Sequence, residues 1–190
     1  VFSALVILGG IKSIAKAATV IVPVMAVGYV AGGLVIILNN LNLVIPALEL
    51  IFKDAFTGEA VAGGAIGAVI RYGVARGVFS NEAGMGSAPI AAAAAKTDHP
   101  ARQGLVSMTG TFIDTIIVCS ITGIVLVMGF IMAGNTFGNE TGAVLTTRVF
   151  DQLLPGVGGW VVTIGIIFFA YSTILGWCYY GEKCCTYIFG

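Results

Sequence analysis

The chain has 190 residues, of which 58% are hydrophobic and only 9% are charged, and its mean hydropathy is +1.02. These values lie outside the range of soluble domains and indicate an integral membrane protein. Nine basic and nine acidic residues give zero net charge, so no basic face suggests a nucleic-acid partner. The single histidine and four cysteines without a C-x-x-C pair argue against a zinc or redox site.

Residues 1–9 read as the end of an apolar helix, and the chain begins at Val1 inside that run, so we expect a fragment of a longer protein. Lys12 and Lys16 follow, and the positive-inside rule places them on the cytoplasmic side. Residues 17–38 carry no charge and predict a helix that crosses the lipid bilayer outward.

Two glycines in this predicted span, Gly28 and Gly32, have the G-x-x-x-G spacing that allows close helix packing. After the span, residues 46–55 are apolar on one side but include Glu49 and Lys53. This segment is too short and too charged to cross the membrane, so we predict a helix on the outer surface.

Residues 60–96 predict a broken helix, because the polar, glycine-rich segment SNEAGMG at 80–86 interrupts an otherwise apolar pattern. Lipid cannot satisfy free backbone groups, so such a break must be sheltered by protein or must line a water-filled cavity. Ser87 is the expected N-cap of the second half-helix. Gly84 and Gly86 would let a ligand approach the main chain, and we therefore predict half of a binding site here.

Four charged residues lie at or near membrane depth: Arg71, Arg76, Glu82 and Asp114. A charged side chain in a membrane span costs several kcal/mol unless it is paired or meets water, so such residues suggest a role in gating or in ion binding. Arg71 and Arg76 point about 140° apart on a helix, so both cannot face one partner. One of them could clamp Glu82 or Asp114, or both could extend to an interface. Two roles are compatible with Asp114: binding an ion, binding a proton or gating on the one hand, and forming a buried structural pair on the other.

The remaining elements are a helix at 103–131, an outer loop with a short helix at 134–156, and a helix at 158–182. Lys96, His99 and Arg102 precede the first of these and fit a cytoplasmic end. Ser172 and Thr173 place two hydroxyls near mid-span. These hydroxyls suit a sodium ion, or they bond back to a carbonyl one helical turn earlier.

Four segments resemble the alanine or glycine:sodium symporter family, the bacterial and archaeal amino acid carriers. They are FSALVILGGIK at 2–12, RYGVARGVFSNEAGMGSAPIAAAAAKTDHPARQG at 71–104, TFIDTIIVCSITGIV at 111–125 and FAYSTILGWCYYGEKC at 169–184. The resemblance implies an all-α integral membrane protein with the five-plus-five inverted-repeat fold of the leucine transporter. The chain would hold the end of core helix four, helix five (17–38), the broken helix six (60–96), helix seven (103–131) and helix eight (158–182).

The resemblance also implies roles for particular residues. The substrate site would be lined by Phe79, Ser80, Asn81, Gly84, Met85, Gly86 and Ser87, and sodium would be held by Ala170, Ser172 and Thr173. Ala92 stands where the family pattern leads us to expect a histidine.

The implied function is sodium-coupled symport of a small neutral amino acid, alanine or glycine, by alternating access across the cytoplasmic membrane of a bacterium. Alternatives are proton coupling through Asp114 or Glu82 and, less favoured, a channel subunit. Because the membrane region offers no nucleophile–base pair, we expect no enzymatic activity. We also expect a missing N-terminal half to supply the first core helix, without which this fragment neither folds stably nor transports.

Overall fold

The computed structural model describes residues 2–56, 74–75, 77–82, 84–134 and 141–190, except for the side chains of residues 2 and 54–56, and each element within these ranges is helical. The elements are α1 (Phe2–Leu8), α2 (Gly10–Asn39), α3 (Leu41–Phe56), α6 (Ser87–Ala92), α7 (Pro100–Phe112), the π-helix η1 (Ile113–Cys119), α8 (Ser120–Met132), α9 (Gly142–Leu153) and α10 (Gly158–Phe189). Arg71 and Arg76 lie outside the described residues.

Three of the described helices are long and apolar enough to cross a membrane. They are α2, the continuous α7–η1–α8 helix from Pro100 to Met132, and α10, with 30, 33 and 32 residues and hydropathies of 2.4, 2.5 and 1.9. At 1.5 Å per residue each is longer than the roughly 30 Å hydrocarbon core, so its ends reach beyond it. The protein is a multi-pass membrane protein, as the composition predicts.

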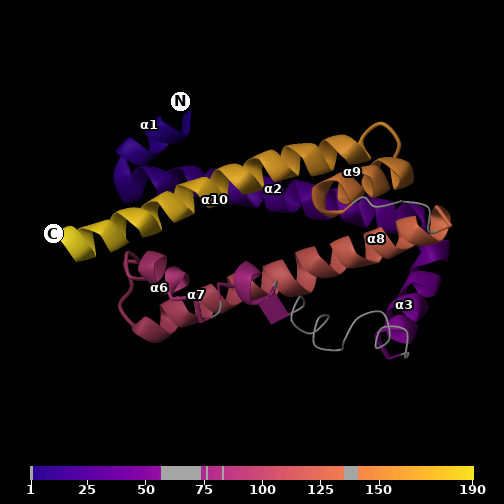
Figure 1. Cartoon of the computed structure of the whole chain (residues 1–190), viewed down its shortest axis with the longest axis horizontal. Helices are drawn as coiled ribbons and strands as arrows, with labels where there is room; N and C mark the ends of the chain where they lie inside the picture. The colour runs from indigo at the N-terminus through magenta and orange to yellow at the C-terminus, as the bar shows by residue number, and fades with distance from the viewer. Residues whose placement is uncertain (1, 57–73, 76, 83, 135–140) are drawn as a thin grey trace.

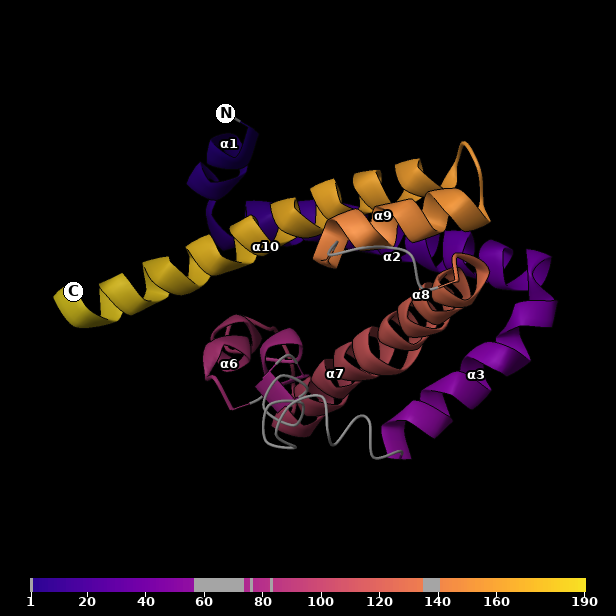
Figure 2. The same cartoon turned by 45° about the vertical axis from the view of Figure 1, so that its right-hand side comes forward.

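Two of the three long helices pack side by side in one layer, and the third lies opposite this layer. Figure 1 shows α2 and α10 running antiparallel and side by side, with α7–η1–α8 opposite and α3 crossing one end of the molecule. The turned view in Figure 2 shows α9 folded back against α10. The start of α2, the start of α7 and the C-terminal end of α10 lie together at the other end (Figure 1). That end carries Lys12, Lys16, Arg102 and Lys183, so we refer to it as the predicted cytoplasmic end.

The apolar core lies toward the α9 end, where Ile36, Val125 and Phe150 are fully buried. A Cβ at Gly32 would stand 2.7 Å from Val161 Cγ1, so this glycine allows α2 and α10 to pack closely. The other glycine of the predicted pair, Gly28, has no such neighbour within 4 Å. The expectation of close packing is therefore confirmed for Gly32 alone.

Two helices begin earlier than the sequence pattern suggests. The first, α2, starts at Gly10 rather than at residue 17, because lysine is a good helix former and its long side chain reaches water from a helix. The second, α3, starts at Leu41 rather than at residue 46. Asn40 ends α2 through its side-chain amide, which donates to the carbonyl of Ile36 (2.9 Å), and its own carbonyl accepts the first bond of α3.

The second half of the broken helix ends sooner than expected, since α6 stops at Ala92 rather than at residue 96. Alanine favours helix, but so short a helix is unstable without tertiary support. The start of α7 also limits how far the preceding helix can extend, because His99 precedes Pro100 and adopts an extended conformation. The His99 ring nitrogen caps α7 by accepting a hydrogen bond from the Ala101 N–H (3.2 Å).

Candidate functional site

The helix is interrupted between Ser80 and Ser87, where the chain makes two turns before α6 begins. Three of the described residues in this break have left-handed backbone conformations: Glu82 (φ 50°), Gly84 (φ 74°) and Gly86 (φ 80°). Glycine adopts this conformation freely, whereas a residue with a Cβ pays about 1–2 kcal/mol. The strained Glu82 must therefore be held by contacts of its own.

Those contacts come from both sides of the break. Glu82 Oε2 accepts a hydrogen bond from Ser87 Oγ (2.7 Å) and a longer one from the hydroxyl of Tyr180 (3.3 Å) on α10. Ser87 is 8% exposed, and Gly86, not Ser87, is the N-cap of α6. The predicted capping role of Ser87 is thus wrong, because its hydroxyl is engaged by the Glu82 carboxylate.

The break faces the π-helical turn η1 in the middle of the α7–η1–α8 span. Ser80 Oγ donates to Asp114 Oδ2 (2.5 Å), and Thr115 Oγ1 donates to Asn81 Oδ1 (3.1 Å). Two consecutive residues of the break thus meet two consecutive residues of η1. Short π-helical turns within α-helices are frequent at functional sites, since the wider turn redirects neighbouring side chains.

A cavity of about 930 Å³ lies between the break, η1 and α10, and we call it the central cavity. Its polar wall includes Ser80, Asn81 and Asp114. Its aromatic wall includes Phe79 and Trp177, whose rings stack with centroids 6.5 Å apart and an angle of 16° between their planes. A polar wall facing an aromatic wall suits a small molecule with one charged and one apolar end.

A second cavity of about 370 Å³, the inner cavity, lies on the side of the break toward α6 and the start of α7. It has Ala88, Ala91 and Ala92 of α6 on one side, Gln103, Ser107, Gly110 and Thr111 of α7 on the other, and Tyr180 of α10. Ser80, Asn81, Glu82 and Asp114 line both cavities. The break and Asp114 therefore form the wall that the two cavities share.

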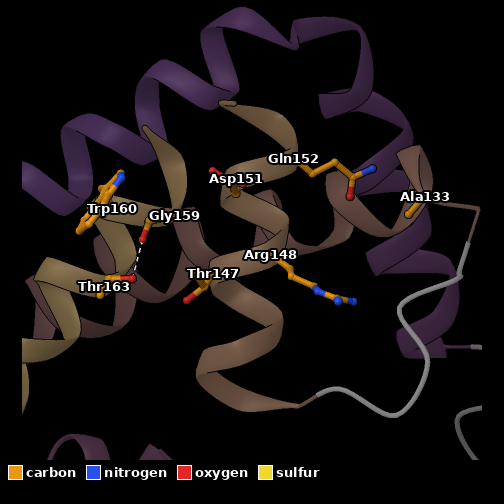
Figure 3. Close-up of a pocket in the computed structure, with 8 residues that line it drawn as sticks. All are labelled: Ala133, Thr147, Arg148, Asp151, Gln152, Gly159, Trp160 and Thr163. Atoms are coloured by element: carbon orange, nitrogen blue, oxygen red, sulfur yellow. Dashed lines mark hydrogen bonds between the residues drawn. The ribbon is translucent and has the colours of Figure 1, made fainter. Parts of the chain in front are cut away.

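A third cavity, of about 730 Å³, lies at the opposite end of the molecule among α8, α9 and α10 (Figure 3). The residues around it include Arg148, Asp151, Gln152 and Trp160, and the Thr163 hydroxyl donates to the Gly159 carbonyl (2.7 Å). None of the residues predicted to bind substrate or sodium lines this cavity. Its size alone does not make it the functional site.

The predicted substrate residues separate into two groups. Phe79, Ser80 and Asn81 line the central cavity, whereas Gly84, Met85 and Gly86 are exposed and line neither the central nor the inner cavity. The glycines contribute backbone shape, and no Cβ placed on either would meet an atom within 4 Å.

The predicted sodium residues also differ from one another. Both Ser172 and Thr173 donate to the carbonyl of Phe169 (2.9 and 2.8 Å), as hydroxyls in helices often do. Thr173 lines the central cavity, whereas Ser172 and Ala170 do not. A hydroxyl that donates its proton to a carbonyl keeps its lone pairs, so these bonds are compatible with cation binding.

Trp177, Tyr180, Thr115 and Cys119 were not anticipated as lining residues, yet each lines one of the two cavities. The α10 residues Phe169, Thr173, Trp177 and Tyr180 recur at intervals of three or four along the helix, and this periodicity was the available signal. Among the described residues, no group of three or more histidine, cysteine or acidic side chains gathers as a metal site.

Comparison with known proteins extends over the whole chain. The profile of the Sodium:alanine symporter family matches residues 1–190. The chain is 61% identical to the sodium/alanine symporter AgcS of Methanococcus maripaludis, covering 100% of this chain and 42% of the relative. It is 37% identical to the sodium/proton-dependent alanine carrier protein of Bacillus sp. PS3 and 38% identical to the amino-acid carrier protein AlsT of Bacillus subtilis.

Each of these two alignments covers 96% of this chain, with 43% and 38% of the relative, respectively. The chain therefore spans well under half the length of the relatives that it matches. Because the family profile covers every residue, the chain belongs to the sodium:alanine symporter family.

Proposed function

We propose that this chain is part of a sodium-coupled symporter that carries a small neutral amino acid, alanine or glycine, across the cytoplasmic membrane by alternating access. The observation that supports this best is the central cavity, which the helix break and the π-helical turn build at the middle of the membrane-spanning helices. The names of two relatives, the sodium/alanine symporter and the sodium/proton-dependent alanine carrier, agree with this assignment.

The polar wall of the central cavity favours the ammonium end of the substrate. Its acceptors include the Asp114 carboxylate and the Asn81 side-chain oxygen. At the start of α6 the Glu82 carboxylate is already bonded to Ser87, and a substrate carboxylate there would be repelled. We therefore place the substrate carboxylate toward helices that lie outside this chain, with its small side chain near Phe79 and Trp177.

Sodium remains assigned to the α10 segment around Ser172 and Thr173, with the carbonyl of Ala170 as a further oxygen ligand. Sodium is a hard cation that takes oxygen ligands, and hydroxyls next to a helix carbonyl supply them. Thr173 lines the central cavity and so would connect the ion site to the substrate.

The architecture that goes with this function is the five-plus-five inverted repeat. In that scheme, α2 is core helix five, the break and α6 belong to helix six, α7–η1–α8 is helix seven and α10 is helix eight. The central cavity is larger than a small amino acid needs, so the remaining segments of a full-length transporter would supply its other walls, including most of the sodium ligands.

The test is uptake of labelled alanine by the full-length protein in proteoliposomes. Replacing external sodium with choline should abolish concentrative uptake, while saturation and counterflow should mark a carrier. Uptake that is unchanged in choline would overturn sodium coupling.

Proton coupling is the second candidate, and Asp114 supports it. This carboxylate lies in a membrane span, lines both cavities and accepts a short hydrogen bond from Ser80. One relative is also named as sodium/proton-dependent. Uptake driven by an imposed proton gradient without sodium, and lost in Asp114→Asn, would favour this candidate.

A further inference from the structure

The two cavities at the break are separated by a thin partition. Ser80, Asn81, Glu82 and Asp114 line both, so the two cavities adjoin at these side chains. Ser80 and Asn81 are tied to η1. Glu82 is tied to α6 through Ser87 and to α10 through Tyr180.

The inner cavity continues toward the predicted cytoplasmic end along a polar stripe of α7. Gln103, Ser107, Thr111 and Asp114 follow one another at helical spacing and line this cavity, opposite the small side chains of α6. The other side of α7 carries large apolar residues such as Leu105 and Val106, which are 63% and 64% exposed and do not line the cavity. A polar stripe of this kind within a membrane helix indicates contact with water.

Tyr180 holds a particular position at the partition. It lines the inner cavity, and its ring packs edge-on against Trp177 of the central cavity, with centroids 5.7 Å apart. Its hydroxyl reaches Glu82 Oε2 over 3.3 Å, which is longer than the 2.7 Å bond from Ser87 to the same oxygen. The bond to Tyr180 is the weaker of the two.

We propose that the Glu82–Tyr180 contact is a gate between the central cavity and the inner cavity, and that the inner cavity is the route by which substrate leaves toward the cytoplasm. The proposal rests on the symport function proposed above. When the contact breaks, Glu82 keeps the hydrogen bond from Ser87, so the carboxylate is not left without a partner. The gate therefore opens at the cost of one long hydrogen bond.

The contact between Tyr180 and Trp177 suggests how substrate controls the gate. A small amino acid in the central cavity would lie beside Trp177, and any shift of that ring is passed to Tyr180 because the two rings are in contact. Residues Glu82 and Tyr180 are thus positioning residues, since they regulate access to the site and do not themselves carry the substrate.

The test measures access to the two cavities from opposite sides of the membrane. In the full-length protein with its other cysteines replaced, Gln103→Cys reports on the inner cavity and the native Cys119 reports on the central cavity. Each single-cysteine protein is treated with a charged, membrane-impermeant methanethiosulfonate reagent from the cytoplasmic side, and the Cys119 protein is also treated from the outside.

Removing the hydroxyl with Tyr180→Phe should shift the open-to-closed ratio by about fivefold, less than a short hydrogen bond to a carboxylate would give, because this bond is 3.3 Å long. Modification of Cys119 from the cytoplasmic side should then become faster and its modification from the outside slower, whereas Gln103→Cys, on the cytoplasmic side of the gate, should keep its rate. Glu82→Gln retains an acceptor for the Tyr180 hydroxyl. In this variant Cys119 should be modified at a rate closer to that of the parent than in Tyr180→Phe. Leu105→Cys, on the other face of α7, is the matched control and should not respond.

Equal cytoplasmic-side rates for Cys119 in the parent and Tyr180→Phe would overturn the gate. Faster modification of Cys119 from both sides would also overturn it, because general loosening opens both sides. If Tyr180→Phe fails to fold, Glu82→Ala provides the same comparison with the acceptor removed. The readout needs no transport, so a parent protein that shows the gating pattern but takes up no alanine would refute the proposed function alone.

Discussion

The hydrogen bond from Ser80 to Asp114 provides a quantitative test of the contact between the break and η1. At 2.5 Å it lies at the short end for a hydroxyl donating to a carboxylate. Hydrogen bonds to charged groups contribute about 1.5–3 kcal/mol, and we take the lower end because this bond borders a cavity that admits water. A loss of about 1.4 kcal/mol corresponds to tenfold in an equilibrium constant.

Ser80→Ala should therefore lower the fraction of protein with a formed site and raise the KM for alanine by up to about tenfold, since apparent affinity scales with the competent fraction. Asp114→Asn retains an acceptor but loses the charge, which roughly halves the strength of the bond. The assay is a double-mutant cycle on alanine uptake by proteoliposomes, with thermal unfolding in detergent as a control for stability. Purely additive effects of the two substitutions would refute the contact.

Three further predictions concern the sodium residues, the backbone of the break and the core. Ser172→Ala should weaken sodium activation alone, whereas Thr173→Val should also raise the alanine KM because Thr173 lines the central cavity; identical profiles would contradict this difference. Gly86→Ala should lower thermal stability by about 1–2 kcal/mol, and Gly86→Asn by less, because the φ of 80° is left-handed. Tyr29→Phe should cost about 1 kcal/mol of stability by removing the 2.7 Å bond to Thr122, with unchanged transport kinetics as the check.

The membrane spans were predictable because lipid imposes a simple rule on sequence. A span must be apolar over roughly 20 residues, and that pattern is local. The broken helix was predictable for a related reason, since a run such as SNEAGMG has no place at membrane depth without a site. The short extent of α6 was not predictable, because alanine propensity favours a longer helix and the chain turns instead to begin α7.

The partners of the charged and polar side chains were the least predictable part. The predicted pairing of Glu82 with Arg71 or Arg76 involves residues outside the described ranges and stays a prediction. Among the described residues, the Glu82 carboxylate contacts Ser87 and Tyr180. Tyr180 is far from Glu82 in sequence, and no local pattern links the two. The π-helical form of η1 was also missed, since no simple sequence rule marks a single π turn.

The sequence by itself determined that this is a membrane protein, which segments form its long helices, and that one helix is interrupted at a polar segment. These properties follow from the cost of placing charge and free backbone groups in lipid, which acts residue by residue. Only the tertiary structure decided that the break meets Asp114 and Thr115 on η1 and that Tyr180 reaches Glu82. Such contacts depend on how separate helices pack, so they emerge only when the whole chain is folded.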